Sequence, residues 1–151
     1  MHTENTSWTQ SVAAVCIHEG RVLQARHTYG PGKGRLIIPR GYIEKGETPM
    51  EAVKREYLEE AGVTIEPGKL IGVRFNQKDW YVVFAAKYVS GKARSDGDEN
   101  DEVVWLPVEE ALERADVPDL TKKLISCALT GGGFEPIPFT SFTTSTLYGV
   151  K

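Results

Sequence analysis

The most constraining feature of the sequence is a helix with both ends marked, in a chain whose other segments favour strands. Thr48 is a suitable N-cap, Pro49 suits the first helical position, and Glu51, three residues after Thr48, completes a capping-box pattern. Good helix formers then continue to Ala61, and Gly62 is a typical residue to end a helix. The sequence therefore predicts one long helix between these two signals.

Short runs of apolar and β-branched residues lie on both sides of this helix. The runs before it cover residues 11–17, 21–25 and 36–39, and the runs after it cover residues 69–75, 80–89 and 103–106. The first two surround His18-Glu19-Gly20 and predict a hairpin, whereas residues 26–34, 41–48 and 90–101 are expected to be turns or loops. Further helices are expected over residues 108–114 and 120–129. The predicted fold is therefore α+β, with a mixed sheet between helices in an α/β/α sandwich.

The length of 151 residues suits one domain with a single core, which we expect over residues 1–133. A run of three glycines then precedes a tail, residues 134–151, which is either disordered or an extended arm packed on its own body or on a partner. A net charge of −3 disfavours binding to duplex nucleic acid, and no apolar run reaches the ~20 residues that span a membrane. The polar N-terminus lacks a signal-peptide pattern, so we expect a cytoplasmic protein. Cys16 and Cys127 lie in apolar stretches and are predicted to be buried free thiols.

Three glutamates of the predicted helix, Glu56, Glu59 and Glu60, carry the clearest chemical signal. At about 100° per residue they fall within roughly a third of the helix circumference, so their charges repel one another. A hard divalent cation such as Mg²⁺, which prefers carboxylate oxygens, would offset that repulsion. The other interpretation of the helix taken alone is a solvated acidic face, since Glu is a good helix former.

The segment before the helix extends this pattern. Residues 41–63 read GYIEKGETPMEAVKREYLEEAGV, which closely resembles the Nudix box, the signature of hydrolases that cleave nucleoside diphosphates linked to another moiety. The matching positions are Gly41, Glu47, Arg55, Glu56, Glu59, Glu60, Gly62 and Val63. Tyr57 departs from the bulky aliphatic residue usual at its position, and we expect its ring in the core and its hydroxyl bonded to a partner or reaching solvent. The order of strands and loops extends the resemblance over about residues 11–129.

The resemblance implies a metal site on the helix. Glu56, Glu59 and Glu60 are expected to bind Mg²⁺ or Mn²⁺, with the carbonyl of Gly41 as a further ligand. Cations on the phosphate oxygens would neutralise the charge that opposes attack by water.

The same resemblance implies roles in orienting and in proton transfer. Arg55 is expected to orient a neighbouring glutamate through a charge-assisted hydrogen bond, with Glu47 as its partner. Relatives differ in the general base, so Glu56, Glu99 and Glu102 are all candidates. For the acidic segment 96–102, a solvated loop is the competing interpretation.

Substrate contacts are less sharply indicated. Four basic residues flank the box and are candidate phosphate contacts, although loop cations often serve only solubility: Arg26, Lys33, Arg35 and Arg40. Trp80 is a candidate for stacking on a base, and core packing is the default for the aromatic residues beside it. The histidines lack the spacing of metal ligands and are expected in turns or on the surface: His2, His18 and His27.

The function that the resemblance implies is metal-dependent hydrolysis of the pyrophosphate bond in a nucleoside diphosphate derivative. Candidate substrates are ADP-ribose-like sugar nucleotides, nucleoside triphosphates, including oxidised ones, and dinucleoside polyphosphates. A non-catalytic Nudix-fold nucleotide sensor is one alternative. An RNA 5′-end pyrophosphohydrolase is another, which the negative net charge disfavours. The resemblance is also compatible with a homodimer.

Overall fold

The structure is a computed structural model that describes residues 8–150. Its elements follow along the chain in the order β1 (Thr9–His18), β2 (Arg21–His27), β3 (Leu36–Ile37), β4 (Arg40–Tyr42), α1 (Pro49–Ala61), β5 (Thr64–Phe75), β6 (Asp79–Ser90), β7 (Asn100–Pro107), α2 (Val108–Glu113), α3 (Asp119–Leu129), β8 (Glu135–Ile137) and β9 (Leu147–Gly149). No helix of the described residues is long and apolar enough to cross a membrane, since the longest, α1, has 13 residues.

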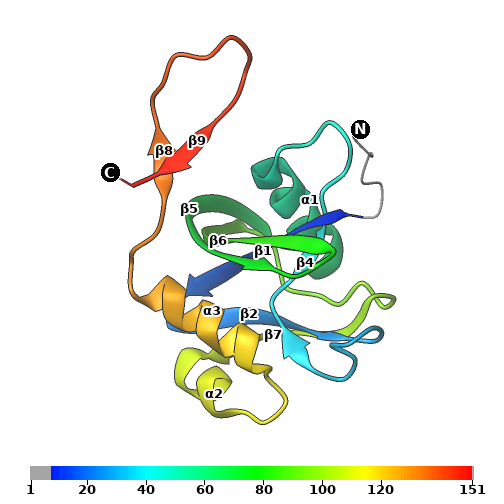
Figure 1. The fold of residues 1–151 in the computed structure, drawn as a ribbon. Helices are drawn as coiled ribbons and strands as arrows, with labels where there is room; N and C mark the ends of the chain where they lie inside the picture. The colour runs from blue at the N-terminus through cyan, green and yellow to red at the C-terminus, as the bar shows by residue number, and fades with distance from the viewer. Residues whose placement is uncertain (1–7, 151) are drawn as a thin grey trace.

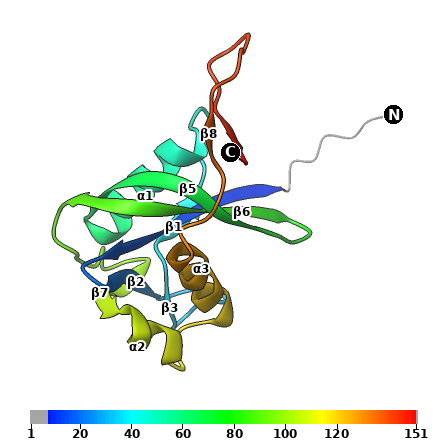
Figure 2. The same ribbon diagram turned by 90° about the vertical axis from the view of Figure 1, so that its left-hand side faces the viewer.

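A mixed sheet lies between α1 on one side and α2 with α3 on the other (Figures 1 and 2). The alternation of side chains along β1 builds both interfaces. Val12, Ala14 and Cys16 pack with the apolar residues of α1, whereas Ala13 and Val15 pack with those of α2 and α3. The predicted α/β/α sandwich is therefore confirmed.

Strand β1 connects the two halves of the sheet. Its last residues form the predicted hairpin with β2, with Ile17 opposite Val22 and His18 opposite Arg21. The rest of β1 pairs in parallel with β6 and antiparallel with β4, whereas β2 diverges to pair with β3 and β7. Strand β5 completes the order as the neighbour of β6. Strand β4, paired with β1, also contacts α1.

Helix α1 has the predicted bounds. The side chain of Thr48 accepts a hydrogen bond from the amide of Glu51, the Glu51 side chain accepts one from the amide of Thr48, and Gly62 ends the helix with φ +74°. Tyr57 is fully buried, and its hydroxyl donates a hydrogen bond of 2.7 Å to the carbonyl of Ala14. The expectation that this ring packs in the core with a partnered hydroxyl is confirmed.

Several other boundaries differ from the predictions. Gly41 and Tyr42 were expected in a turn, but they lie in β4, opposite Val12 and Ser11 of β1. Strand β7 begins at Asn100, inside the expected loop, because it pairs with the end of β2. Both strands depend on partners distant in sequence, which local patterns do not show.

The tail forms a hairpin of β8 and β9 that extends away from the sandwich (Figure 1). It is joined to the body at Phe134, which exchanges two backbone hydrogen bonds of 2.9 Å with Leu70 of β5. The ring of Tyr148 packs edge-on against Phe84, with ring centroids 5.7 Å apart. The described residues of the tail therefore form a hairpin that contacts β5 and β6.

Both cysteines are free thiols, as predicted. Cys16 is buried, and burial raises the pKa of its thiol to about 12. Cys127, on α3, is only half-buried.

Candidate active site

An acidic cleft of about 400 Å³ lies beside α1. It is lined by side chains of α1, of the β4–α1 loop and of the β6–β7 loop: Glu44, Arg55, Glu56, Glu59, Glu60, Asp96, Asp98 and Glu99. Seven of these eight side chains are carboxylates, and Arg55 is the one cation among the described residues that line the cleft. So many like charges favour a ligand that brings positive charge.

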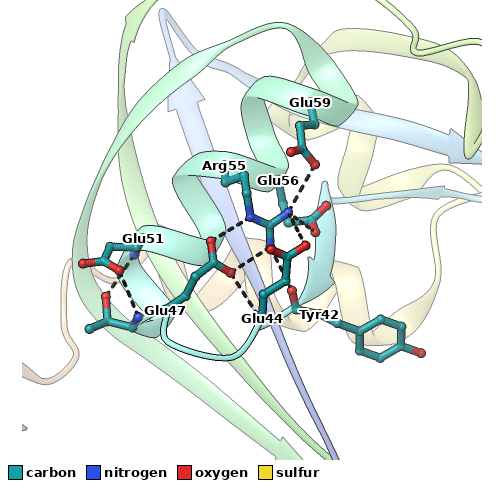
Figure 3. A network of polar contacts seen from close by, with 8 residues as sticks. Tyr42, Glu44, Glu47, Glu51, Arg55, Glu56 and Glu59 are labelled. Atoms are coloured by element: carbon teal, nitrogen blue, oxygen red, sulfur yellow. Dashed lines mark hydrogen bonds and ion pairs between the residues drawn. The ribbon is translucent and has the colours of Figure 1, made fainter.

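Arg55 is the centre of the polar network in this cleft (Figure 3). Its Nε and Nη2 donate hydrogen bonds of 2.7 and 2.9 Å to the two carboxylate oxygens of Glu47. Its Nη1 donates to Glu56 at 2.9 Å and to Glu59 at 3.2 Å. The predicted contact between Arg55 and Glu47 is therefore present in the planar, two-point form that a guanidinium makes best.

The same network shifts the pKa of its members. The hydrogen bond from Arg55 lowers the pKa of Glu47 to about 2, and the hydrogen bond to Glu47 raises the pKa of Arg55. Burial raises the pKa of Glu56 to about 7, although Arg55 acts in the opposite direction. A group whose charged form is so poorly solvated gains most when a cation binds beside it.

Gly41 is in direct contact with this network through Glu56. A Cβ atom at residue 41 would overlap all three atoms of the Glu56 carboxylate, so any larger residue would displace this carboxylate. Gly41 is held in β4 opposite Val12, and Glu56 projects from α1. The glycine therefore lets the sheet approach a carboxylate of the helix.

Glu60 is almost completely buried, with 1% of its surface exposed. The ring of His27 lies with its Nε2 3.0 Å from one carboxylate oxygen, and the amide of Arg40 donates a 3.0 Å hydrogen bond to the other. The expectation that His27 lies in a turn or on the surface is wrong: it is 7% exposed, at the end of β2. His18 is half-exposed at the β1–β2 turn, and His2 lies outside the described residues.

Hydrogen bonds hold the loop of residues 95–99 close to the end of α1 and to Thr28, the residue after β2. The buried side chain of Asn100 donates a hydrogen bond of 2.9 Å to the carbonyl of Glu60. Thr28 donates from its amide to the Glu99 carbonyl and from its hydroxyl to the Asp98 carbonyl. Burial, with the charges of Glu60 and two loop aspartates, raises the pKa of Glu99. Sequence reasoning did not single out Asn100, and a lone asparagine carries no signal that could reveal this contact.

The other candidate base, Glu102, lies elsewhere. Its carboxylate accepts a 3.0 Å hydrogen bond from Nε of Arg26, and it is not among the described residues that line the cleft. Arg26 also pairs with Asp116 at 3.1 Å. Arg26 of β2 and Glu102 of β7, both predicted site residues, therefore pair with each other.

Four other residues were expected to contact the substrate: Lys33, Arg35, Arg40 and Trp80. The Arg40 guanidinium lies 5.2 Å from the centre of the Tyr81 ring. Lys33 and Arg35 are exposed in the loop before β3. Trp80 is half-exposed at the start of β6, with its ring edge-on to Phe75 and Trp8. None of these four is among the described residues that line the cleft.

The donor chemistry of the cleft fits a divalent cation such as Mg²⁺ or Mn²⁺, because all seven acidic groups offer hard oxygen ligands. Within residues 8–150, no three potential ligand side chains converge on one point as they stand. Nη1 of Arg55 lies within hydrogen-bonding distance of both Glu56 and Glu59. A cation that bound these two carboxylates would compete with the guanidinium for them.

Comparison with known proteins shows the family to which this chain belongs. Residues 8–126 match the model of the NUDIX domain. The chain is 37% identical over 107 residues to a MutT-like protein of Streptomyces ambofaciens, covering 69% of this chain and 67% of that protein. It is 37% identical over 93 residues to an 8-oxo-(d)GTP phosphatase of Mycolicibacterium smegmatis, covering 58% of this chain but 28% of that protein.

The fold also resembles that of solved NUDIX hydrolase structures. A crystal structure of a NUDIX hydrolase from Nitrosomonas europaea superposes with a TM-score of 0.73 at 24% identity, covering 87% of this chain and 78% of that one. The chain belongs to the Nudix hydrolase family.

Proposed function

We propose that this protein uses Mg²⁺ or Mn²⁺ to hydrolyse the phosphoanhydride bond of a nucleoside diphosphate derivative. The observation that carries the proposal is the cleft itself, which gathers seven carboxylates around one arginine. Three of those carboxylates come from neighbouring positions of a single helix, Glu56, Glu59 and Glu60. A substrate with several negative charges fits such a cleft only together with cations.

We assign the binding of the cations to Glu56, Glu59 and Glu60. When bound, the cations supply neutralisation of the phosphate charge and polarise the bond to be cleaved. His27 and the amide of Arg40 hold Glu60 in place, and Arg55 aligns Glu56 and Glu59 while Glu47 fixes the guanidinium. These contacts orient the ligands before substrate arrives, which lowers the cost of ordering them.

We assign the general base to Glu99. It lines the cleft, its pKa is raised, and two hydrogen bonds from Thr28 to the carbonyls of residues 98 and 99 hold its loop. A carboxylate with a raised pKa is a better acceptor for the proton of an attacking water. Glu102 is less suited to this role because Arg26 holds it on β7. Glu56 stays the alternative, since it also lines the cleft.

The preferred substrate class that we propose is a nucleoside triphosphate, including oxidised ones. Support comes from the two relatives named above, an 8-oxo-(d)GTP phosphatase and a MutT-like protein. The substrate panel for a test also contains an ADP-ribose-like sugar nucleotide and a dinucleoside polyphosphate. The resemblance supports a homodimer, which light scattering of the purified protein tests.

The decisive experiment measures release of nucleoside monophosphate, together with pyrophosphate or the phosphorylated remainder, from this panel with Mg²⁺, with Mn²⁺ and with EDTA. We expect turnover only with a divalent cation, and its loss in Glu56→Gln. Glu66→Gln is the matched control, because Glu66 is exposed on β5 and pairs only with Lys54 at 3.4 Å among the described residues. Tight nucleotide binding without turnover of any compound would contradict the enzymatic proposal and favour a sensor.

A comparison of two variants distinguishes the proposed general base from the proposed metal ligands. Glu99→Gln is expected to lower kcat by about 100-fold or more while keeping the affinity for Mn²⁺. Glu56→Gln is expected to lose affinity for Mn²⁺ as well. A Glu99→Gln protein with unchanged kcat would return the role of base to Glu56.

A further inference from the structure

A second pocket, of about 540 Å³, lies away from the acidic cleft. Its lining includes the side chains of His18, Glu19, Arg21, Tyr88, Lys92 and Trp105. Strand β2 runs from Arg21 in this pocket to His27 beside the cleft, a span of about 20 Å at the usual rise of a strand. The volume lies in the range of roughly 300–1,000 Å³ that is typical of sites for small molecules.

Three half-buried aromatic side chains form the wall of this pocket. The rings of His18 and Tyr88 lie 4.5 Å apart at an angle of 32°. The ring of Trp105 lies edge-on to Tyr88, at 5.8 Å and 79°. The hydroxyl of Tyr88 donates to the carbonyl of Gly91 at 2.7 Å, which fixes its orientation. A wall of oriented aromatic rings offers stacking surface to a planar ligand.

A two-residue turn, Glu19-Gly20, contributes Glu19 to the lining of this pocket. Glu19 and Gly20 have φ of +51° and +76°, the combination typical of a tight hairpin turn. This turn places His18 directly opposite Arg21. Glu19 itself adopts a conformation that residues other than glycine rarely take.

The charge of this pocket is opposite to that of the cleft. Arg21 and Lys92 both line it, and within residues 8–150 neither has a carboxylate within ion-pair distance. Nη1 of Arg21 only reaches the carbonyl of Trp105, at 3.4 Å. The one acidic side chain of the lining, Glu19, lies 3.8 Å from His18. An anion can therefore bind here without a metal ion.

We propose that this pocket is a second binding site, for a planar aromatic ring that carries a phosphate, as in a nucleoside monophosphate. The ring stacks on one aromatic face of this wall, and the phosphate pairs with Arg21 and Lys92. Binding here needs no divalent cation, unlike binding in the acidic cleft.

The pocket and the cleft share one loop. Gly91 to Ala93 line the pocket, whereas Asp96, Asp98 and Glu99 line the cleft. Between them, the amide of Arg94 donates a 2.9 Å hydrogen bond to the carbonyl of Ala61 at the end of α1. A ligand held by Lys92 therefore contacts the segment that carries the acidic side chains.

The test is calorimetric titration of the full chain with AMP and with GMP in EDTA. Adenosine and ribose 5-phosphate are the partial ligands, and inorganic phosphate is the third. We expect saturable binding of at least one monophosphate, and binding at least about tenfold weaker for each partial ligand, because each lacks one half of the recognition. Equal binding of ribose 5-phosphate, or no saturable binding in EDTA, would overturn the proposal.

Substitutions in the pocket and in the cleft show which of the two binds the monophosphate. The double variant Arg21→Glu and Lys92→Glu is expected to lower the affinity for the monophosphate by about tenfold or more, since hydrogen bonds to charged groups contribute free energies of that size. Lys78→Glu is the control, an exposed lysine at the opposite end of β6, and it should bind as the natural protein does. Glu56→Gln should also retain binding. Binding that is insensitive to the double variant but altered by Glu56→Gln would place the ligand in the cleft and reject the second site, whatever the outcome of the hydrolysis assays.

Discussion

The Cα atom of Gly41 lies directly against the carboxylate of Glu56, so closely that a methyl group on Gly41 would occupy the same space. This contact joins the short strand β4 to the catalytic face proposed for α1. It means that the position of Glu56 depends on the absence of a side chain 15 residues earlier in the sequence.

Gly41→Ala is therefore expected to displace Glu56 and to reduce kcat by about 100-fold, the effect of moving a catalytic group by about 1 Å. The measurement is nucleotide hydrolysis with saturating Mg²⁺, beside the melting temperature of each variant. Gly32→Ala is the matched control, because a Cβ there meets only Ile37 at 3.9 Å. A Gly41→Ala protein as active as the Gly32→Ala protein would show that Glu56 needs no such space.

Replacement of His27 is expected to weaken binding of Mn²⁺ through Glu60. His27→Leu removes the 3.0 Å contact to the Glu60 carboxylate, and loss of such a supporting contact typically costs about 10- to 100-fold in metal affinity. His27→Gln, whose amide can still donate, should recover much of that loss. Electron paramagnetic resonance titration of free Mn²⁺ measures both affinities without any substrate. Equal affinities in all three proteins would mean that His27 serves packing alone.

Tyr57→Phe is expected to lower the free energy of unfolding by about 1 kcal/mol, because it removes a buried hydrogen bond and leaves the ring in place. Urea denaturation measures the change. Tyr148→Phe is a suitable comparison, since that hydroxyl makes no hydrogen bond within residues 8–150 and its ring packs on Phe84. The prediction fails if the two variants are equally stable.

The Glu47–Arg55 pair is expected to make stability depend on acid pH. The folded pKa of Glu47, about 2, is below its ordinary value of 4.5, so the contribution is fully present above about pH 4.5 and is lost as the pH falls toward 2. The free energy of unfolding of the natural protein and of Glu47→Gln should therefore differ most near pH 6 and converge below pH 4.5. A difference that stays constant between pH 6 and pH 3 would contradict the assigned pairing.

The features predicted correctly from sequence are those whose signals are local. The ends of α1 depend on Thr48, Glu51 and Gly62, which act within four residues of the helix ends. The partner of Arg55 could also be predicted from sequence, since Glu47 is only eight residues away and belongs to the same motif.

The features that were missed depend on pairs distant in the chain. His27 is buried because it meets Glu60, 33 residues later, and β4 exists because Gly41 lies opposite Val12. The pairing of Glu102 with Arg26, 76 residues apart, is of the same kind. No local composition distinguishes these positions from exposed turn residues, because their environment is set by the packing of the whole sheet.

The guanidinium of Arg55 also has a consequence for the charge balance of the cleft. Carboxylates so close together repel one another, and Arg55 acts as counter-ion for four of them, Glu56 and Glu59 on α1 and Glu44 and Glu47 in the loop before it. The positive charge that offsets this repulsion is therefore supplied by the chain itself, and a cation that bound Glu56 and Glu59 would have to displace one side chain rather than rearrange the helix.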